Sequence, residues 1–296
     1  MDQIGTYVNG NTIVTMYNDG TKVRYTRDGQ IPAPEFPESM DLKITNRCDL
    51  GCEFCSVRST PDGDHADLND PILDTIRPYT ELAIGGGNPL EHPDLFAFLS
   101  RMQSKKVICN LTVNAAHFIP NAAWLDRLSE NGLIHGLGIS VPEYVPEKLF
   151  SFLPRFPNAV IHTIAGYTPM KVFDRLANKN LNLLILGYKN MGSGEEYMHS
   201  HPDLIASYFS ALEDRLPSMR SQFKAIAFDN LAVQQLHLRD KMSREEWDSM
   251  YMGDDGDFTM YIDLVKHTYA ASSTHKPRPI DASSIKELFQ HVKENK

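Results

Sequence analysis

The sequence lacks any apolar run long enough to cross a membrane. A spanning helix needs about 18 or more consecutive apolar residues, and the 296 residues contain no such stretch. Positive charge is also in deficit, because 29 lysines and arginines stand against 38 aspartates and glutamates. The formal net charge of -9 disfavours a general nucleic-acid surface, which attracts phosphates with excess positive charge. We therefore expect neither a membrane span nor bulk nucleic acid as a partner.

Cysteine is scarce, and its distribution excludes a disulfide framework. The chain has 4 cysteines, and three of them crowd between residues 48 and 55, whereas secreted scaffolds spread paired cysteines along the chain. The N-terminal residues also lack the basic and apolar segments of a secretory signal. We expect a cytoplasmic protein in a reducing environment, where thiolates stay free to bind metal.

From residue 39 onward, strand-like and helix-like patterns alternate. Expected strands cover residues 40–45, 82–84, 106–114, 133–141, 159–165 and 181–186, and expected helices cover 72–79, 94–105, 122–131, 147–153 and 170–177. Such alternation implies parallel pairing, because each helix returns the chain over a face of the sheet. We predict an α/β fold whose ligands bind at the carboxyl ends of the strands.

The two ends of the chain read differently from this central part. Residues 1–38 predict a small β-meander with hairpin turns and a proline-rich connector. Residues 39–190 form the predicted core, and residues 191–296 a mixed α/β extension. Within the extension we expect strands at 223–228 and 258–266 and helices at 203–215, 231–241, 244–250 and 283–293.

Cys48, Cys52 and Cys55 stand at C-x3-C-x2-C spacing directly after the first core strand. Three thiolates on one loop suit a soft metal or an iron–sulfur cluster. A four-cysteine zinc site normally has two separate cysteine pairs, and Cys109 reads as a buried core thiol instead. A zinc site with a histidine as fourth ligand stays open, with His65 as the nearest candidate.

This motif resembles that of the radical S-adenosylmethionine (SAM) enzymes, including the aromatic Phe54 before the last cysteine. The resemblance covers about residues 39–190 and implies a partial (β/α)6 TIM-like barrel. It implies an oxygen-sensitive 4Fe–4S cluster held by the three cysteines, with SAM on the fourth iron. It also implies reductive cleavage of SAM to a 5′-deoxyadenosyl radical, and an electron donor such as a flavodoxin or ferredoxin. No cysteine follows residue 109, so we expect no auxiliary-cluster domain.

The resemblance also proposes SAM contacts beyond the cysteines. Gly86 and Gly87 match a glycine turn that lets the SAM amino group approach, and Asn88 stands where the family usually has an acidic residue. An amide oxygen accepts a hydrogen bond but carries no charge, which predicts weaker binding of SAM. The remaining candidates by position are Phe54, Ser140, Ile164, Gly187 and Tyr188.

Three functional hypotheses follow from these residues. The first is a radical SAM enzyme that acts on a small molecule or a peptide, with no catalytic side chain assigned. The second is a non-catalytic sensor or scaffold that binds the cluster and SAM, which the neutral Asn88 keeps open. The third is a structural zinc protein.

Overall fold

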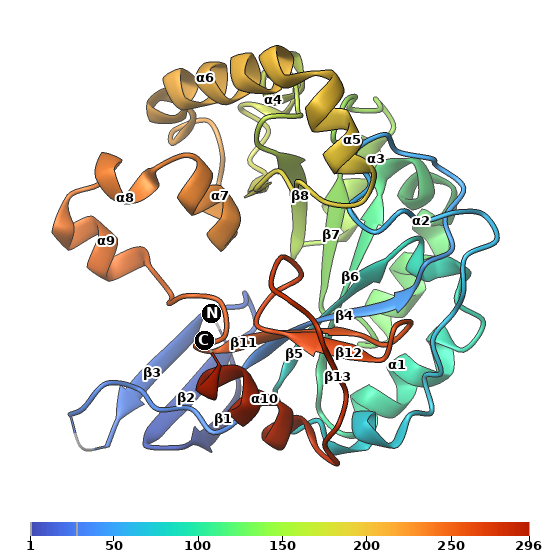
Figure 1. The fold of residues 1–296 in the computed structure, drawn as a ribbon, viewed down its shortest axis with the longest axis vertical. Coiled ribbons are helices and arrows are strands. Elements are labelled where there is room, and N and C mark those ends of the chain that lie inside the picture. The colour runs from blue at the N-terminus through green and yellow to red at the C-terminus, as the bar shows by residue number, and fades with distance from the viewer. Residues whose placement is uncertain (1, 28, 296) are drawn as a thin grey trace.

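The N-terminal residues form a separate three-stranded antiparallel sheet in the computed structural model, which describes residues 2–27 and 29–295 (Figure 1). Its strands are β1 (Gln3–Asn9), β2 (Thr12–Tyr17) and β3 (Lys22–Thr26). The buried Asn9 accepts hydrogen bonds from the amides of Glu35 and Phe36 and donates to the Phe36 carbonyl, so it fixes the connector. The predicted β-meander is confirmed.

The main sheet has ten strands in the order β10-β9-β8-β7-β6-β5-β4-β11-β12-β13. Pairing is parallel from β10 to β11 and antiparallel for β12 and β13. The strands are β4 (Ser39–Thr45), β5 (Glu81–Gly86), β6 (Ile108–Asn114), β7 (Gly136–Ser140), β8 (Ala159–Ile164), β9 (Asn182–Leu186), β10 (Ala225–Phe228), β11 (Thr259–Asp263), β12 (Thr268–Ala270) and β13 (Arg278–Pro279). This open, curved sheet with its extension confirms the predicted partial barrel.

Helices cover the outer face of the sheet, and Figure 1 shows α1 and α2 on that side. They are α1 (Leu95–Ser104), α2 (Ala115–Glu130), α3 (Leu149–Phe152), α4 (Met170–Leu176), α5 (Ser193–Ser200), α6 (Pro202–Met219), α7 (Asn230–Gln235), α8 (Leu238–Lys241), α9 (Arg244–Met250) and α10 (Ile285–Glu294), with 3-10 turns η1 (Pro71–Thr75), η2 (Pro89–Glu91) and η3 (Leu153–Arg155). Alternate strand residues such as Leu42, Ile84 and Leu111 point into this fully buried core. Among the described residues, no helix has the length and apolar character that a membrane crossing requires.

Three predicted helices are wrong in extent. The helix expected at 72–79 shrinks to the single turn η1, because Pro78 disfavours helix at the residue before it and Tyr79 adopts a φ of 66°. The helix expected at 231–241 breaks into α7 and α8 at His237, whose φ is 51°. The helix expected at 122–131 begins at Ala115, where the Asn114 side chain accepts a hydrogen bond from the Ala116 amide.

The C-terminal extension joins the sheet along β4, at the edge opposite to the one that pairs with β5. The strand expected at 258–266 is β11, which pairs in parallel with β4. Lys43 and Asp263 form a buried ion pair across these strands, with Nζ and Oδ2 3.0 Å apart. The sequence predictions did not include β12, β13 or α5.

Candidate functional site

The loop after β4 carries the three cysteines and is tied to the rest of the molecule by backbone hydrogen bonds. The Cys48 amide donates to the Thr60 carbonyl at 2.9 Å, which closes the loop at its base. The Cys55 carbonyl accepts from Ser193 at the start of α5, also at 2.9 Å. The Ser59 amide donates to the Cys55 sulfur at 3.4 Å. Backbone donors of this kind tune iron–sulfur clusters through their sulfurs.

The three thiols lie within one another's electrostatic field. None is in a disulfide, and each is partly buried. The pKa of Cys52 is raised to about 11, chiefly by burial and in smaller part by the negative charges of Cys55 and Cys48. The pKa of Cys48 is also raised, chiefly by burial. Three thiolates held together in this way require a cation to offset their charge, so the donor set fits an iron–sulfur cluster.

The glycine turn at the end of β5 packs directly on the cysteine loop. Gly86 has a φ of 124°, and a Cβ there would lie 2.4 Å from the Thr45 carbonyl oxygen. A Cβ on Gly87 would lie 2.2 Å from the carbonyl oxygen of Arg47. The Gly87 amide donates to Thr45, and the Asn88 amide donates to Arg47. These glycines are therefore required by the close approach of the loop backbone.

The side chain of Asn88 is occupied in shaping the turn η2. Its Oδ1 accepts from the Leu90 amide at 3.3 Å, and its Nδ2 donates to Glu91 Oε1 at 3.0 Å. The residue is only 5% exposed. Glu91 lies close enough to the cysteine loop for its charge to raise the pKa of Cys48. The sequence reasoning missed Glu91, although residues three apart in a 3-10 turn lie on one side.

The other candidate residues lie in two places. Phe54, Ile164 and Tyr188 belong to one apolar cluster, in which the rings of Phe54 and Tyr167 are 4.1 Å apart. Ser140 stands apart from that cluster at the end of β7, beside His162 of β8.

The backbone around Gly187 and Tyr188 is already bonded within the chain. The Gly187 amide donates to Asp229 at 2.8 Å. The amide and carbonyl of Tyr188 both bond the side-chain amide of Gln235 at 2.8 Å. An adenine base that formed hydrogen bonds to this backbone would have to displace the side chains of Asp229 and Gln235.

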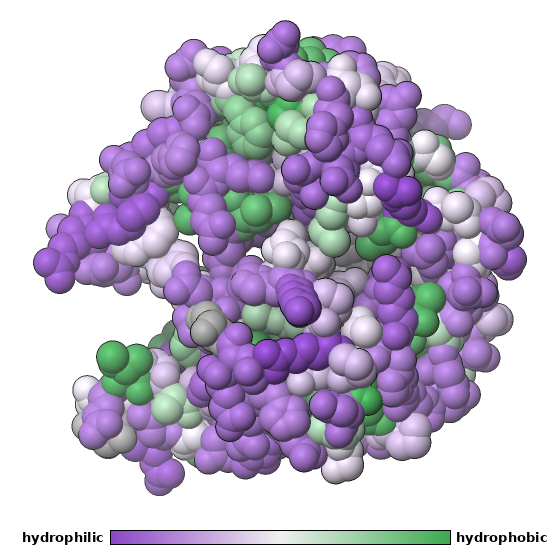
Figure 2. All heavy atoms as spheres, viewed as in Figure 1, coloured by the Kyte–Doolittle hydropathy of each residue, from purple (hydrophilic) through white to green (hydrophobic). Residues whose placement is uncertain are grey.

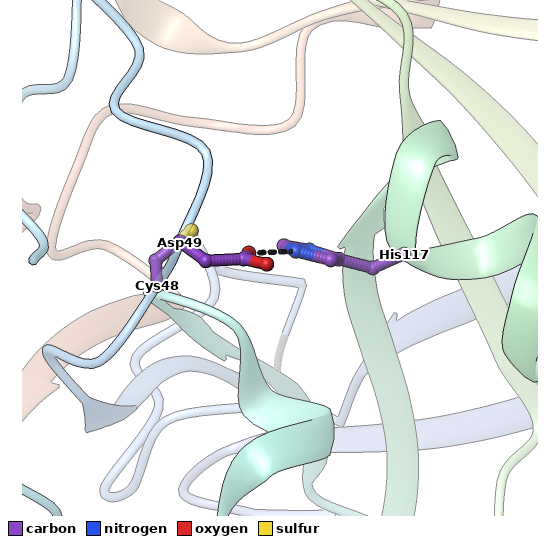
Figure 3. Close-up of side chains that lie close together, drawn as sticks. All are labelled: Cys48, Asp49 and His117. Carbon is purple, nitrogen blue, oxygen red and sulfur yellow. Dashed lines mark hydrogen bonds and ion pairs between the residues drawn. The ribbon is translucent and has the colours of Figure 1, made fainter. Parts of the chain in front are cut away.

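His65 points to neighbours other than the thiols. Its Nδ1 is 2.8 Å from Thr45 Oγ1, and its ring packs on His92 with centroids 4.8 Å apart. The histidine beside the cysteines is His117, on the first turn of α2 (Figure 3). Potential ligand atoms of Cys48, Asp49 and His117 all lie within 4.8 Å of one another. The sequence offered only a weak signal for His117, its place three residues after a strand end.

A cavity of about 460 Å³ lies beside the amino-terminal halves of β4, β5 and β11. Figure 2 shows the surface hollowed between the N-terminal sheet and the segment that follows α9. Strand residues with short side chains leave this space, and carboxylates line much of it. The lining includes Asp41, Ala83, Asn110, Asp229, Asp255 and Thr259.

Comparison with known proteins places this geometry in context. Residues 42–183 match the radical SAM superfamily. A comparison with curated protein sequences finds no match. Streptococcus suis SuiB bound to its precursor peptide SuiA has 15% sequence identity and a TM-score of 0.54, over 88% of this chain and 65% of SuiB. SuiB bound to S-adenosylmethionine has 14% identity and a TM-score of 0.52, over 83% of this chain and 64% of SuiB. At these identities the likeness is one of fold, and the chain spans just under two thirds of SuiB.

Proposed function

Because residues 42–183 match the radical SAM superfamily, we propose that this chain is an enzyme that cleaves SAM reductively and oxidises a substrate by hydrogen abstraction. The observation that carries the proposal is the set of three free cysteines on a loop that packs against the glycine turn of β5. Cys48, Cys52 and Cys55 would hold a 4Fe–4S cluster, which supplies one electron and an open iron position when bound.

We propose that SAM binds beside this loop, between two groups of residues. Glu91 provides negative charge for the SAM amino group, with Asn88 holding its carboxylate in place. Phe54, Ile164 and Tyr188 provide the apolar surface for the adenine. The backbone of Gly86, Gly87 and Gly187 and the hydroxyl of Ser140 complete the proposed contacts.

The substrate, a small molecule or a peptide, is proposed to enter through this cavity and to reach the cysteine loop at the opposite ends of the strands. SuiB, of similar fold, binds a precursor peptide. Ala83 lines the cavity, so Ala83→Phe would fill space that the substrate needs. An extract of the source cells is fractionated, and fractions that increase 5′-deoxyadenosine formation by the wild type are selected. The same fractions should not increase its formation by Ala83→Phe. Equal stimulation of both proteins would remove the cavity from the proposal.

The proposed electron donor is a flavodoxin or ferredoxin, and the proposed compartment is the cytoplasm. Both follow from the reaction, since an iron–sulfur cluster must be reduced and kept from oxygen. An anaerobic assay with each purified donor in place of a chemical reductant tests this part.

Anaerobic reconstitution with iron and sulfide tests the central proposal. We expect about four irons and four sulfides per chain, as a 4Fe–4S cluster requires, and loss of the cluster in Cys48→Ala. With SAM and a strong reductant, the loaded protein should form 5′-deoxyadenosine. A loaded protein that binds SAM without cleaving it would instead support a sensor or scaffold. Zinc without acid-labile sulfide in anaerobically prepared protein would support a structural zinc site.

A further inference from the structure

Helix α2 reaches the cysteine loop through one charged hydrogen bond. His117 Nε2 lies 2.6 Å from Asp49 Oδ1, and the two residues are 68 positions apart in the sequence (Figure 3). The His117 side chain is 11% exposed, whereas that of Asp49 is 66% exposed. The bond therefore joins an exposed surface carboxylate to a largely buried ring.

The direction of this bond decides what the pair does. A carboxylate only accepts hydrogen bonds, so His117 Nε2 carries the proton and donates it. A nitrogen that carries a proton has no free lone pair for a metal. Cys48, Asp49 and His117 lie close together, and Nε2 of the histidine is committed to Asp49, which leaves only Nδ1 with a lone pair.

The charge of Asp49 acts on the neighbouring cysteine. Its ligand oxygen lies within 4.8 Å of the Cys48 sulfur, so its negative charge opposes further negative charge on that sulfur. Reduction of a cluster bound there adds one further negative charge, supplied by an external reductant. A carboxylate that is held and partly neutralised by a donor opposes this step less than a free one.

We propose that His117 is a positioning residue for the cluster, acting through Asp49. It fixes the carboxylate beside Cys48 and offsets its charge, and so keeps the cluster easier to reduce. The inference rests on the proposed cluster at Cys48, Cys52 and Cys55. Helix α2, which follows β6, would thus influence the reduction of a cluster that is held by the loop after β4.

A redox titration of the reconstituted protein, followed by the electron paramagnetic resonance of the reduced cluster, tests this role. At a fixed solution potential, His117→Ala should lower the ratio of reduced to oxidised cluster by about threefold or more. Asp49→Asn should raise the ratio, and the double variant should match Asp49→Asn. His117→Gln, which keeps a donor, should recover part of the wild-type ratio. His199→Ala on α5 is the matched control and should leave the ratio unchanged.

Iron and sulfide contents separate this inference from the proposed function. A loaded His117→Ala protein with the wild-type ratio would overturn the inference alone. So would additive effects in the double variant, because His117 would then act without Asp49. Zinc that the wild type holds and His117→Ala loses would also overturn it, since the three groups would be metal ligands. Failure of the wild type to take up a cluster would overturn both proposals.

Discussion

Glu91 carries a negative charge close to the position where the motif has the neutral Asn88. The two side chains are bonded at 3.0 Å, and the Asn88 oxygen is already engaged by the Leu90 amide. We therefore expect Glu91→Gln to weaken SAM binding about tenfold, because a hydrogen bond to a charged group contributes about 1.5 kcal/mol or more. Isothermal titration of the cluster-loaded protein, without reductant, measures the change.

The sharpest control for the role of Glu91 moves the carboxylate from residue 91 to residue 88. The double variant Asn88→Asp with Glu91→Gln should recover much of the affinity for SAM. Glu245→Gln, on the exposed face of α9, should have no effect. An unchanged dissociation constant in Glu91→Gln would show that the amino group of SAM is bound elsewhere.

Single residues differ in how far the sequence reveals them. The spacing of Cys48, Cys52 and Cys55 is local, so the loop and its chemistry follow from the motif itself. The contact of His117 with Asp49 depends on how β6 and α2 pack beside the loop, which no local pattern records. The proposed role of Asn88 as a SAM ligand stays a prediction, and its side chain is engaged within the turn.

At the scale of elements, alternating apolar patterns predicted the parallel strands well because strands such as β5, β6 and β9 bury alternate residues. Helix ends were predicted less well, because single residues with left-handed backbone conformation decide where a helix ends. The left-handed Tyr79 and His237 ended or divided two expected helices. The pairing of β11 with β4 joins residues 220 positions apart at Lys43 and Asp263, which periodicity does not specify.

The ion pair between these two strands has a measurable consequence. Lys43 is 3% exposed and Asp263 is 7% exposed at their side chains, so removal of one partner leaves a buried charge. We expect Asp263→Ala to lower the free energy of unfolding by about 3 kcal/mol. Urea denaturation followed by circular dichroism measures the loss.

The control for this pair removes both charges. Lys43→Met with Asp263→Leu should recover most of the stability, because no unpaired charge is then buried. A single Asp263→Ala variant as stable as the wild type would mean that water reaches Lys43 and that β11 is loosely joined to β4.

At the scale of the whole molecule, the sheet leaves its inner face open to ligands. Small strand residues such as Ala83 border the cavity, whereas the space over Gly138 is filled by the ring of His162, which a Cβ there would approach to 2.3 Å. The sequence predicted ligand binding at the carboxyl strand ends but not the cavity near Asp41. That cavity depends on how the N-terminal sheet and the segment after α9 sit beside the barrel.

The cysteine loop joins parts of the chain that are distant in sequence, so its ligands should stabilise the whole molecule. The loop contacts α5 through Cys55 and α2 through Asp49. Cluster loading should therefore raise the melting temperature in an anaerobic thermal scan at one fixed rate. SAM at about 100 times its dissociation constant should add about 2.7 kcal/mol, which is roughly 5 °C for a chain of this size.

Different substitutions should remove the increase in melting temperature from the cluster and the increase from SAM. Glu91→Gln, at the same SAM concentration, should keep the increase in melting temperature from the cluster and lose part of the increase from SAM. Cys48→Ala should lose both, because in the proposed function SAM would bind at the open iron of a cluster that the cysteines hold. A SAM-dependent increase that persists in Cys48→Ala would contradict this order, since it would require a binding site for SAM that does not depend on the cluster.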